Sequence, residues 1–464
     1  MKQFSLIMAI AVGLLAAVSC SDFLEERSQD EVIPTTTADY SEILLTYMSL
    51  YNYDMLYILD DDVQLASYIS YPTTLVQYAG CFTWQPDMWE LENALISGYQ
   101  ETYTSIMGFN AVLDDIDDAE GTQEERDMVK AEALGLRALA YYYLVNMFGE
   151  PYNSNRQALG VPLKLTAVLG ENGMLRNTVE EVYNQMVSDL ENASALFAQY
   201  PKRRGNYRMN GTTVDILLSR VYLYMERWDD AVTAATRAIE SAEGLSDYTG
   251  YEMYASYRGN FIMPTYGLSE VEWVWGNYFS WFNFYYLFDP SNELLALYTS
   301  NDRRLDLWMP YNMVYKKEVN ASANTPSNTI RISEAYLNRA EARILSATPD
   351  LTGALSDLNE LKRHRITGYQ DMTSTDNLLT EVRNERRREL CFDWHRWFDL
   401  RRYGMPAITH DYRASNEDPL MTYTLRENDP LYTLPFPTSA IEHNMSLQQN
   451  PSASEPRRSG VPAN

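Results

Sequence analysis

Apolar side chains recur at helical spacing along much of this chain. Between residues 127 and 148 they stand three or four residues apart, at Val129, Ala133, Leu136, Ala140, Tyr143, Leu144 and Met147. Gly149 and Pro151 follow directly, which is typical of a helix end. A capping box from Thr178 to Glu181 starts a second amphipathic helix, which stops before Pro201. The pattern predicts a mostly helical protein.

Two further segments each predict a pair of helices joined by a short turn. The first pair covers 212–226 and 229–242, and the second lies within 331–365. Such hairpins bury their apolar faces only against neighbours, so we expect several to stack. An irregular helical bundle is the alternative. Residues of the first pair match the tetratricopeptide pattern at Ser219, Tyr222, Trp228, Ala231 and Ala238, although that pattern usually has an aromatic residue at Ala235.

Residues 244–330 interrupt the helical pattern and are rich in Tyr, Gly, Asn, Trp and Pro. They predict an irregular insert, with loops, short strands and short helices over 244–290 and a loop over 320–328. The stretch after Ala407 is punctuated by proline and is also expected to be irregular. We therefore expect one body over 40–464, with helical repeats at about 90–243 and 331–403 and the insert at about 244–330.

The first nineteen residues resemble an export signal. Lys2 precedes an apolar run from Phe4 to Val18, shorter than the roughly 20 residues that span a membrane. Small residues before Cys20 resemble a lipobox, although Ala17 stands where Leu is usual. We expect residues 1–19 to be removed, Cys20 to be acylated, and residues 20–39 to form a flexible tether. Secretion without a lipid is the alternative.

The formal net charge of −27 and the three cysteines exclude several functions. A surface this acidic repels phosphate backbones, and no basic stripe is present, so nucleic acid is not an expected partner. The cysteines, Cys20, Cys81 and Cys391, provide neither a disulfide framework nor a metal knuckle. Cys81 and Cys391 could pair or remain two separate buried thiols, and the sequence leaves both options open.

Three segments resemble motifs of the SusD/RagB family of outer-membrane nutrient-binding lipoproteins. They are Arg331 to Ala342, Val382 to Phe392 with Arg396 to Arg402, and Leu434 to Pro437 with Gln448 to Pro451. Asp393 stands where the family more often has Glu. The resemblance covers nearly the whole chain. It implies about four tetratricopeptide-like helix pairs that support a ligand-binding face, and a surface-exposed location on the outer membrane with a TonB-dependent, SusC-like transporter as partner.

Under this resemblance we expect a glycan-binding lipoprotein that delivers oligo- or polysaccharide to the transporter. Sugar rings stack on flat aromatic side chains, because a ring face desolvates favourably while a hydroxyl gains little by leaving water. Residues 272–283 are the densest aromatic stretch, and Trp273 and Trp275 would share one face of a strand. Alternatively, that face packs on the scaffold. The predicted ligand-binding residues are Trp273, Trp275, Asn277, Tyr278, Trp281 and, in a loop before a helix at Trp89, Trp84.

Other functions are less consistent with the sequence. The same scaffold could bind peptides or another nutrient, and an intracellular repeat adaptor would conflict with the export signal. A glycosidase needs two carboxylates about 5–9 Å apart, and such a pair always occurs by chance among 64 acidic residues. The sequence has no zinc-protease, nucleophile-elbow, Walker or dinucleotide motif. We therefore expect no enzymatic activity and no catalytic residues.

Two charged segments remain. Asp60, Asp61 and Asp62 provide the oxygen ligands that calcium prefers, but three consecutive residues rarely converge on one ion. We expect a solvated loop or cap there and no cofactor, with a structural calcium ion left open. Residues 385–389, which contain three arginines between two glutamates, predict an ion-pair network that supports the fold.

Overall fold

The computed structural model describes residues 33–48, 53, 55–170, 173–201, 205, 207–250, 270–275, 287–309 and 328–463. The predicted signal, Cys20, Asn277, Tyr278 and Trp281 lie outside these residues. So do most of the predicted tether and positions 320–327 of the predicted loop. Among the described helices, none combines the length and the apolar composition that crossing a bilayer requires.

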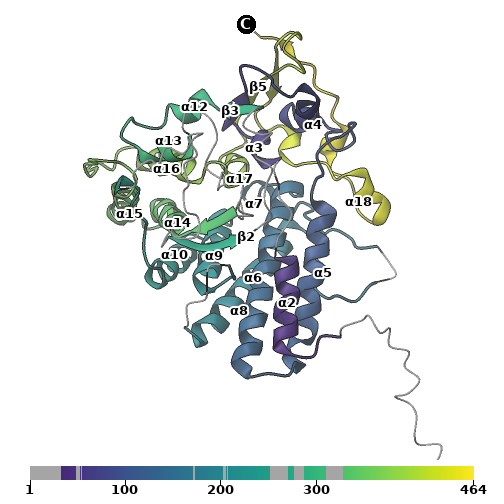
Figure 1. Cartoon of the computed structure of the whole chain (residues 1–464), viewed down its shortest axis with the longest axis vertical. Helices are drawn as coiled ribbons and strands as arrows, with labels where there is room; N and C mark the ends of the chain where they lie inside the picture. Colours follow the sequence, from purple (N-terminus) through teal and green to yellow (C-terminus); the bar gives the residue numbers. More distant parts are fainter. Residues whose placement is uncertain are drawn as a thin grey trace, which may run out of the picture.

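Antiparallel helices form the lower part of the molecule as drawn in Figure 1. The longest, α6 (Gln123–Phe148), is buried along most of its length and packs against both α5 and α8. The chain then continues from α8 to α9 and from α9 to α10, each packed against the helix before it. Capping boxes start α6 at Thr122 and α8 at Thr178, as the sequence predicts for α8. The other bounds are α2 (Thr37–Tyr47), α5 (Tyr99–Asp115), α8 (Val179–Gln199), α9 (Gly211–Tyr224) and α10 (Trp228–Ser241).

The second run of helices continues this scaffold. The first helix of the run, α14 (Ile332–Leu345), packs against α9 and α10 and also against α15 (Leu351–Arg363) and α16 (Leu378–Leu390). The short α17 (Arg396–Arg402) follows. Both predicted hairpins, α9 with α10 and α14 with α15, are therefore confirmed. The predicted helix at Trp89 is wrong: residues 86–93 form turns, Asn93 has a left-handed backbone (φ 59°), and α5 begins only at Tyr99.

Short strands and helices cover the upper end of the scaffold (Figure 1). Strand β1 pairs with β3, β2 pairs with β4, and β5, β6 and β7 form a three-stranded sheet, all antiparallel. The irregular tail predicted after Ala407 thus contains a hairpin. Burial alternates along β5, but the apolar–polar pattern of its sequence does not show this, because the polar His410 takes a buried position between Ile408 and Tyr412. The strands are β1 (Val63–Leu65), β2 (Val271–Trp275), β3 (Phe288–Pro290), β4 (Asn328–Arg331), β5 (Ile408–Tyr412), β6 (Met421–Leu425) and β7 (Val461–Pro462).

The smaller helices connect these parts. They are α3 (Leu56–Leu59), α4 (Pro72–Phe82), η1 (Ile116–Asp118), α7 (Tyr152–Asn155), η2 (Tyr248–Gly250), α12 (Asn292–Leu295), α13 (Arg303–Trp308), η4 (Pro430–Tyr432), α18 (Thr438–His443) and η5 (Pro451–Ser454). The described part of the predicted insert has the mixture of short elements that its composition indicates.

The ion-pair network predicted at 385–389 is confirmed. The Glu385 and Glu389 side chains are fully buried, and each lies against Arg304, with Nη1–oxygen distances of 2.6 and 2.9 Å. Arg365 contacts Glu389 at 3.0 Å and Glu270 at 2.7 Å. Arg386 reaches Asp399 of α17 at 2.8 Å. Buried charges of this kind are stable only when paired, so the network joins α13, α16 and α17.

Candidate functional site

Trp84, one of the predicted ligand-binding residues, lies in the core. Its indole is 0% exposed, and its Nε1 donates a hydrogen bond of 2.9 Å to the carbonyl oxygen of Leu59. The ring stacks on His410, with centroids 4.3 Å apart. A ring enclosed in this way offers no face to a ligand in solution, so the prediction for Trp84 is wrong in this structure.

Trp273 lies on β2, as the sequence predicts for a strand residue, but its side chain is also 0% exposed. The strand pairs with β4, with Trp273 opposite Ile330 and Trp275 opposite Asn328, and it packs on α9. The alternative in which this face packs on the scaffold is therefore correct for Trp273. The side chain of Trp275 and the whole of Asn277, Tyr278 and Trp281 lie outside the description, so their predicted roles remain predictions.

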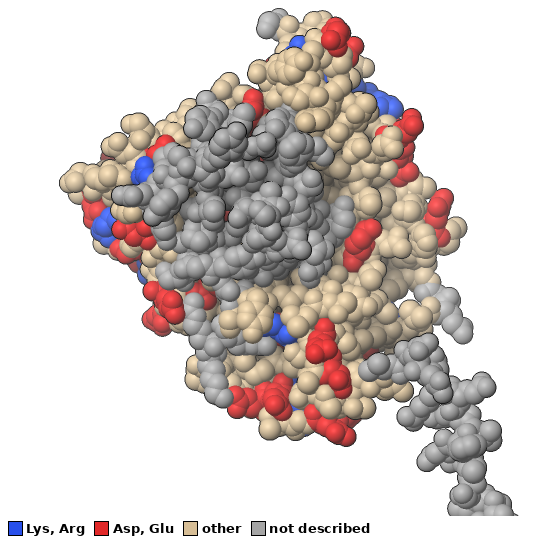
Figure 2. Space-filling view, in the orientation of Figure 1, with Lys and Arg blue, Asp and Glu red and all other residues tan. Residues whose placement is uncertain are grey.

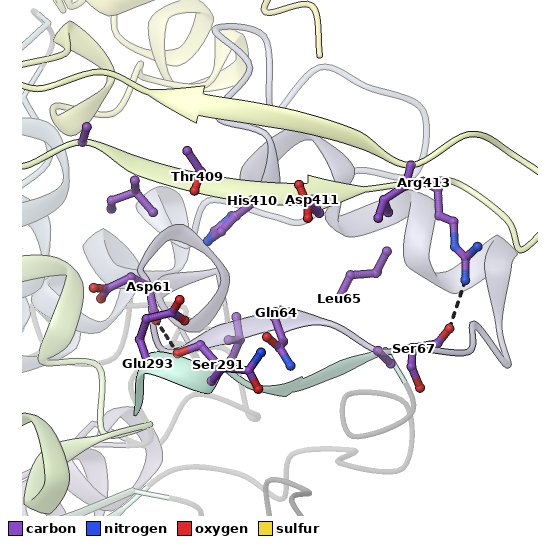
Figure 3. Close-up of a pocket in the computed structure, with 16 residues that line it drawn as sticks. Asp61, Gln64, Leu65, Ser67, Ser291, Glu293, Thr409, His410, Asp411 and Arg413 are labelled. Carbon is purple, nitrogen blue, oxygen red and sulfur yellow. Dashed lines mark hydrogen bonds between the residues drawn. The ribbon is translucent and has the colours of Figure 1, made fainter. Parts of the chain in front are cut away.

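A polar cavity of about 670 Å³ opens instead at the upper end of the molecule (Figure 3). One wall consists of β1 and the residues that follow it, up to Ser67, together with residues 291–293 at the start of α12. Residues 407–413, which include β5, form the other wall. The Ser291 Oγ donates to the Asp61 carbonyl oxygen at 2.7 Å and fixes α12 against the end of α3. We refer to this cavity as the β1–β5 groove.

Several side chains of the β1–β5 groove are free to bind a ligand. Gln64 is half-buried, while Asn292 and Thr409 are exposed. Within the described part of the chain, no hydrogen bond joins these three side chains to other groups. Each amide both donates and accepts, and the hydroxyl does so too. The groove therefore offers mixed donors and acceptors to a polar, uncharged ligand.

His410 holds the β5 wall in place. Its two ring nitrogens lie 2.8 Å from the Phe82 carbonyl oxygen and 2.9 Å from the Asp60 carbonyl oxygen. Phe82 and Trp84 cover its two faces, with centroid distances of 4.2 and 4.3 Å. Burial lowers the pKa of His410 to about 4, against the opposing effect of the two carbonyl groups. The two carbonyl contacts and the two stacked rings fix the imidazole and thereby position the wall.

The Asp60–Asp62 cluster differs from the solvated loop that the sequence predicts. Asp60 and Asp62 are buried, and one oxygen from each of the three carboxylates lies within 4.8 Å of the others. Two arginines approach the cluster: Arg396 contacts Asp61 at 2.6 Å and Arg387 contacts Asp62 at 2.7 Å. The sequence does not reveal this burial, because the two arginines belong to α16 and α17, more than three hundred positions further along the chain.

The arginines also set the charge of this cluster. Burial and the neighbouring charges of Asp62 and Asp61 raise the pKa of Asp60 well above its ordinary value. Burial opposes ionisation of Asp61 as well, but Arg396 and Arg387 outweigh it and lower the pKa of Asp61. Burial also raises the pKa of Asp62, against the opposing effect of Arg387 and Arg396, so Asp61 is the carboxylate of the cluster that most favours its ionised form.

Three further charged side chains line the β1–β5 groove, those of Glu293, Asp411 and Arg413. Glu293 is exposed and has no partner among the described residues, and Asp411 is exposed and accepts one hydrogen bond, from Thr422 Oγ1 at 2.5 Å. Among the described residues, the hydrogen bonds that Arg413 donates go to neutral oxygens, those of Ser67 at 3.0 Å and Asn416 at 3.4 Å. In Figure 3, Glu293 and Arg413 lie towards opposite ends of the groove.

None of the residues that line the groove was among the ligand-binding residues predicted from the sequence. The alternation along β5 would have identified Thr409 and Asp411 as outward-facing, had His410 been recognised as buried. Nothing in the sequence places 63–67 next to 407–413. Tyr68 was also overlooked: it follows Ser67 at the groove and exposes 69% of its surface.

Comparison with known proteins gives this scaffold a family. A model described as starch-binding and associating with the outer membrane matches residues 22–223, and the SusD family model matches residues 296–452. The chain belongs to the SusD/RagB family. No curated protein sequence matches it.

Solved SusD-like structures share the fold over nearly their whole length. A SusD superfamily protein from Bacteroides thetaiotaomicron has a TM-score of 0.71 at 23% identity, covering 90% of this chain and 100% of that one. A SusD-like carbohydrate binding protein from Bacteroides vulgatus has a TM-score of 0.66 at 20% identity, covering 89% and 97%. A laminarin binding SusD-like protein has a TM-score of 0.64 at 19% identity, covering 90% and 100%. The predicted tetratricopeptide-like fold of the SusD/RagB family is confirmed.

Proposed function

We propose that the protein captures oligo- or polysaccharide at the cell surface and delivers it to a TonB-dependent, SusC-like outer-membrane transporter. The observation that carries this proposal is the pair of SusD-family matches over 22–223 and 296–452, one of them described as starch-binding. Two of the similar structures are, by name, a carbohydrate binding protein and a laminarin binding protein. Glycans are therefore the ligand class that we propose for this chain.

The β1–β5 groove supports this proposal chemically. Gln64, Asn292 and Thr409 supply donors and acceptors for sugar hydroxyls. Hydrogen bonds alone give a saccharide little net affinity, because each replaces one to water. Apolar contact with ring faces must add to them, and we propose for that role the exposed Tyr68, which follows the lining residue Ser67 in the sequence. Trp275, Asn277, Tyr278 and Trp281 remain proposed contributors.

Calorimetry with a broad set of oligosaccharides tests the function and the site separately. A triple variant, Gln64→Ala with Asn292→Ala and Thr409→Ala, should weaken binding at least tenfold, since each net hydrogen bond contributes about 0.5–1.5 kcal/mol. Gln199→Ala, at the exposed end of α8, is the matched control. Native affinity in the folded triple variant would reject the groove as the site. Binding of no glycan, together with binding of peptides, would instead favour a peptide-binding function.

The aromatic contribution is tested by Tyr68→Ala. Loss of the stacking surface should weaken glycan binding by roughly tenfold, on the scale of about 1–3 kcal/mol for burying an aromatic face. Tyr207→Ala removes another exposed tyrosine, 64% exposed, and is the matched control. Equal affinity of the two variants would remove Tyr68 from the site.

The membrane anchor and the transporter are separate parts of the proposal. Labelled palmitate should be incorporated into the native chain and not into Cys20→Ala, and only the native chain should fractionate with the outer membrane. Affinity purification from membranes should recover a TonB-dependent transporter. We also propose binding without catalysis, so incubation with polysaccharides should release no reducing sugar. Steady release would show an enzyme.

A further inference from the structure

The charges of the β1–β5 groove carry an inference about which glycans it accepts. Asp61 is paired with Arg396 and Arg387, so its own charge is compensated. Glu293 and Asp411 are exposed and contact no cation within the described structure. They come from opposite walls, Glu293 from α12 and Asp411 from β5. A ligand between the walls therefore meets two uncompensated carboxylates.

The one cation among the described residues that line the groove lies apart from this pair. Arg413 is held by the Ser67 and Asn416 backbone oxygens, and Figure 3 shows it at the end away from Glu293. Its charge can meet an acidic group only at that end. The middle of the groove and its Glu293 end remain electronegative.

The net charge of the protein adds to this effect. The chain has a formal net charge of −27, and acidic side chains recur among the described residues on the face drawn in Figure 2. A polyanion approaching the protein is repelled before it reaches the groove, which lowers its rate of association. A neutral polysaccharide experiences neither effect.

We propose that the β1–β5 groove selects neutral saccharides and rejects glycans that carry carboxylate or sulfate groups, with Glu293 and Asp411 as the residues that discriminate. This inference rests on the proposed function, namely that a glycan occupies the groove. One like-charge contact at about 4 Å weakens binding about fivefold even at the dielectric constant of water. Contact with both carboxylates should therefore separate neutral and acidic ligands by about 25-fold or more.

A glycan array with neutral, uronate-containing and sulfated members is the first test, using the purified native protein. We expect neutral glycans to bind and acidic ones to be absent from the ligands. Acidic glycans that bind as well as neutral ones would overturn the charge selection and leave the proposed function intact. An array without any bound glycan would overturn the proposed function, and the inference with it.

Paired ligands then test the two residues. A neutral oligosaccharide that binds is compared with its derivative in which primary hydroxyls are oxidised to carboxylates. In Glu293→Gln with Asp411→Asn, the ratio of the affinity for the oxidised form to the affinity for the neutral form should rise at least tenfold. Arg413→Gln should weaken the oxidised form further, and Glu240→Gln, an exposed change on α10, should alter neither. An unchanged ratio in the double variant would refute the assignment.

Ionic strength gives an independent readout. The preference of the native protein for the neutral form should shrink as salt rises from low to physiological, where the screening length falls to about 8 Å. The double variant should show little salt dependence. A preference that is independent of salt would show that shape, and not charge, excludes the oxidised ligand.

Discussion

The indole of Trp84 stacks on the imidazole of His410, with ring centroids 4.3 Å apart and 24° between the planes. The two residues come from distant parts of the chain, Trp84 just after α4 and His410 in β5, and both are buried. Their contact joins the N-terminal and C-terminal parts of the chain at the β5 wall of the β1–β5 groove.

Trp84→Ala should therefore lower stability and not remove a sugar-binding surface. Emptying a buried indole site costs about 3–5 kcal/mol of unfolding free energy. Urea denaturation measures this loss. Tyr68→Ala should show the opposite behaviour, with unfolding free energy within about 0.5 kcal/mol of the native protein but weaker glycan binding. A stable Trp84→Ala protein that fails to bind glycan would restore Trp84 as a ligand contact.

His410 should make the protein less stable in mild acid. Its pKa is lowered from 6.5 to about 4 by burial, so the unfolded chain takes up its proton first as pH falls. The stability associated with neutral His410 is complete above pH 6.5 and is lost progressively towards pH 4, by at most about 3 kcal/mol. His410→Gln, with urea midpoints measured across the same interval, should lack this component. Parallel curves for the two proteins would contradict it.

Glu389→Gln should be destabilising because it removes one charge partner from each of two buried arginines, Arg304 and Arg365, which keep Glu385 and Glu270. Glu389 contacts Arg304 at 2.9 Å and Arg365 at 3.0 Å, and all three side chains are fully buried. Breaking such a pair costs about 3–5 kcal/mol. The control is Asp117→Asn, which removes a surface partner of Lys130 and should cost less than about 1 kcal/mol. Similar losses for the two variants would show that the network contributes little.

Cys81 and Cys391 should remain unreactive until the protein unfolds. Both are buried thiols that form no disulfide with each other, and burial raises the pKa of the Cys81 thiol, so its reactive thiolate is scarce. In Cys20→Ala they are the two remaining cysteines of the chain. Mass spectrometry after maleimide treatment should find no label on the folded variant and two labels in urea. Rapid labelling of the native protein would mean that the region around one thiol opens readily.

Helices with a clear apolar stripe could be predicted from the sequence, whereas those that bury charge could not. The spacing of Val129 to Met147 identifies α6, and the small residues of α9 and α10 identify a hairpin. In α16 the buried positions include Glu385, Arg386 and Glu389, so the helix has no apolar stripe to detect. Its periodicity becomes visible only once Arg304 and Asp399 are known to lie opposite.

The site was harder to predict because its parts meet only in the folded chain. An aromatic residue in a polar loop, such as Trp84, has the same sequence signature whether it faces water or packs on a histidine far along the chain. The same limit explains the Asp60–Asp62 cluster, whose counterions, Arg387 and Arg396, are on other helices. Exposed polar residues such as Gln64 and Asn292 have no distinguishing pattern at all.

The walls of the β1–β5 groove come from residues 63–67, 291–293 and 407–413, near the beginning, the middle and the end of the chain. Hydrogen bonds such as that from Arg458 to the Trp84 carbonyl oxygen, at 2.9 Å, close the same region from the C-terminus. Contacts between such distant positions form late and slowly during folding. A chain that lacks residues 407–413 can therefore form the helices of the scaffold but not the groove, because one of its two walls is missing until the C-terminal part of the chain has folded onto residues 63–67 and 291–293.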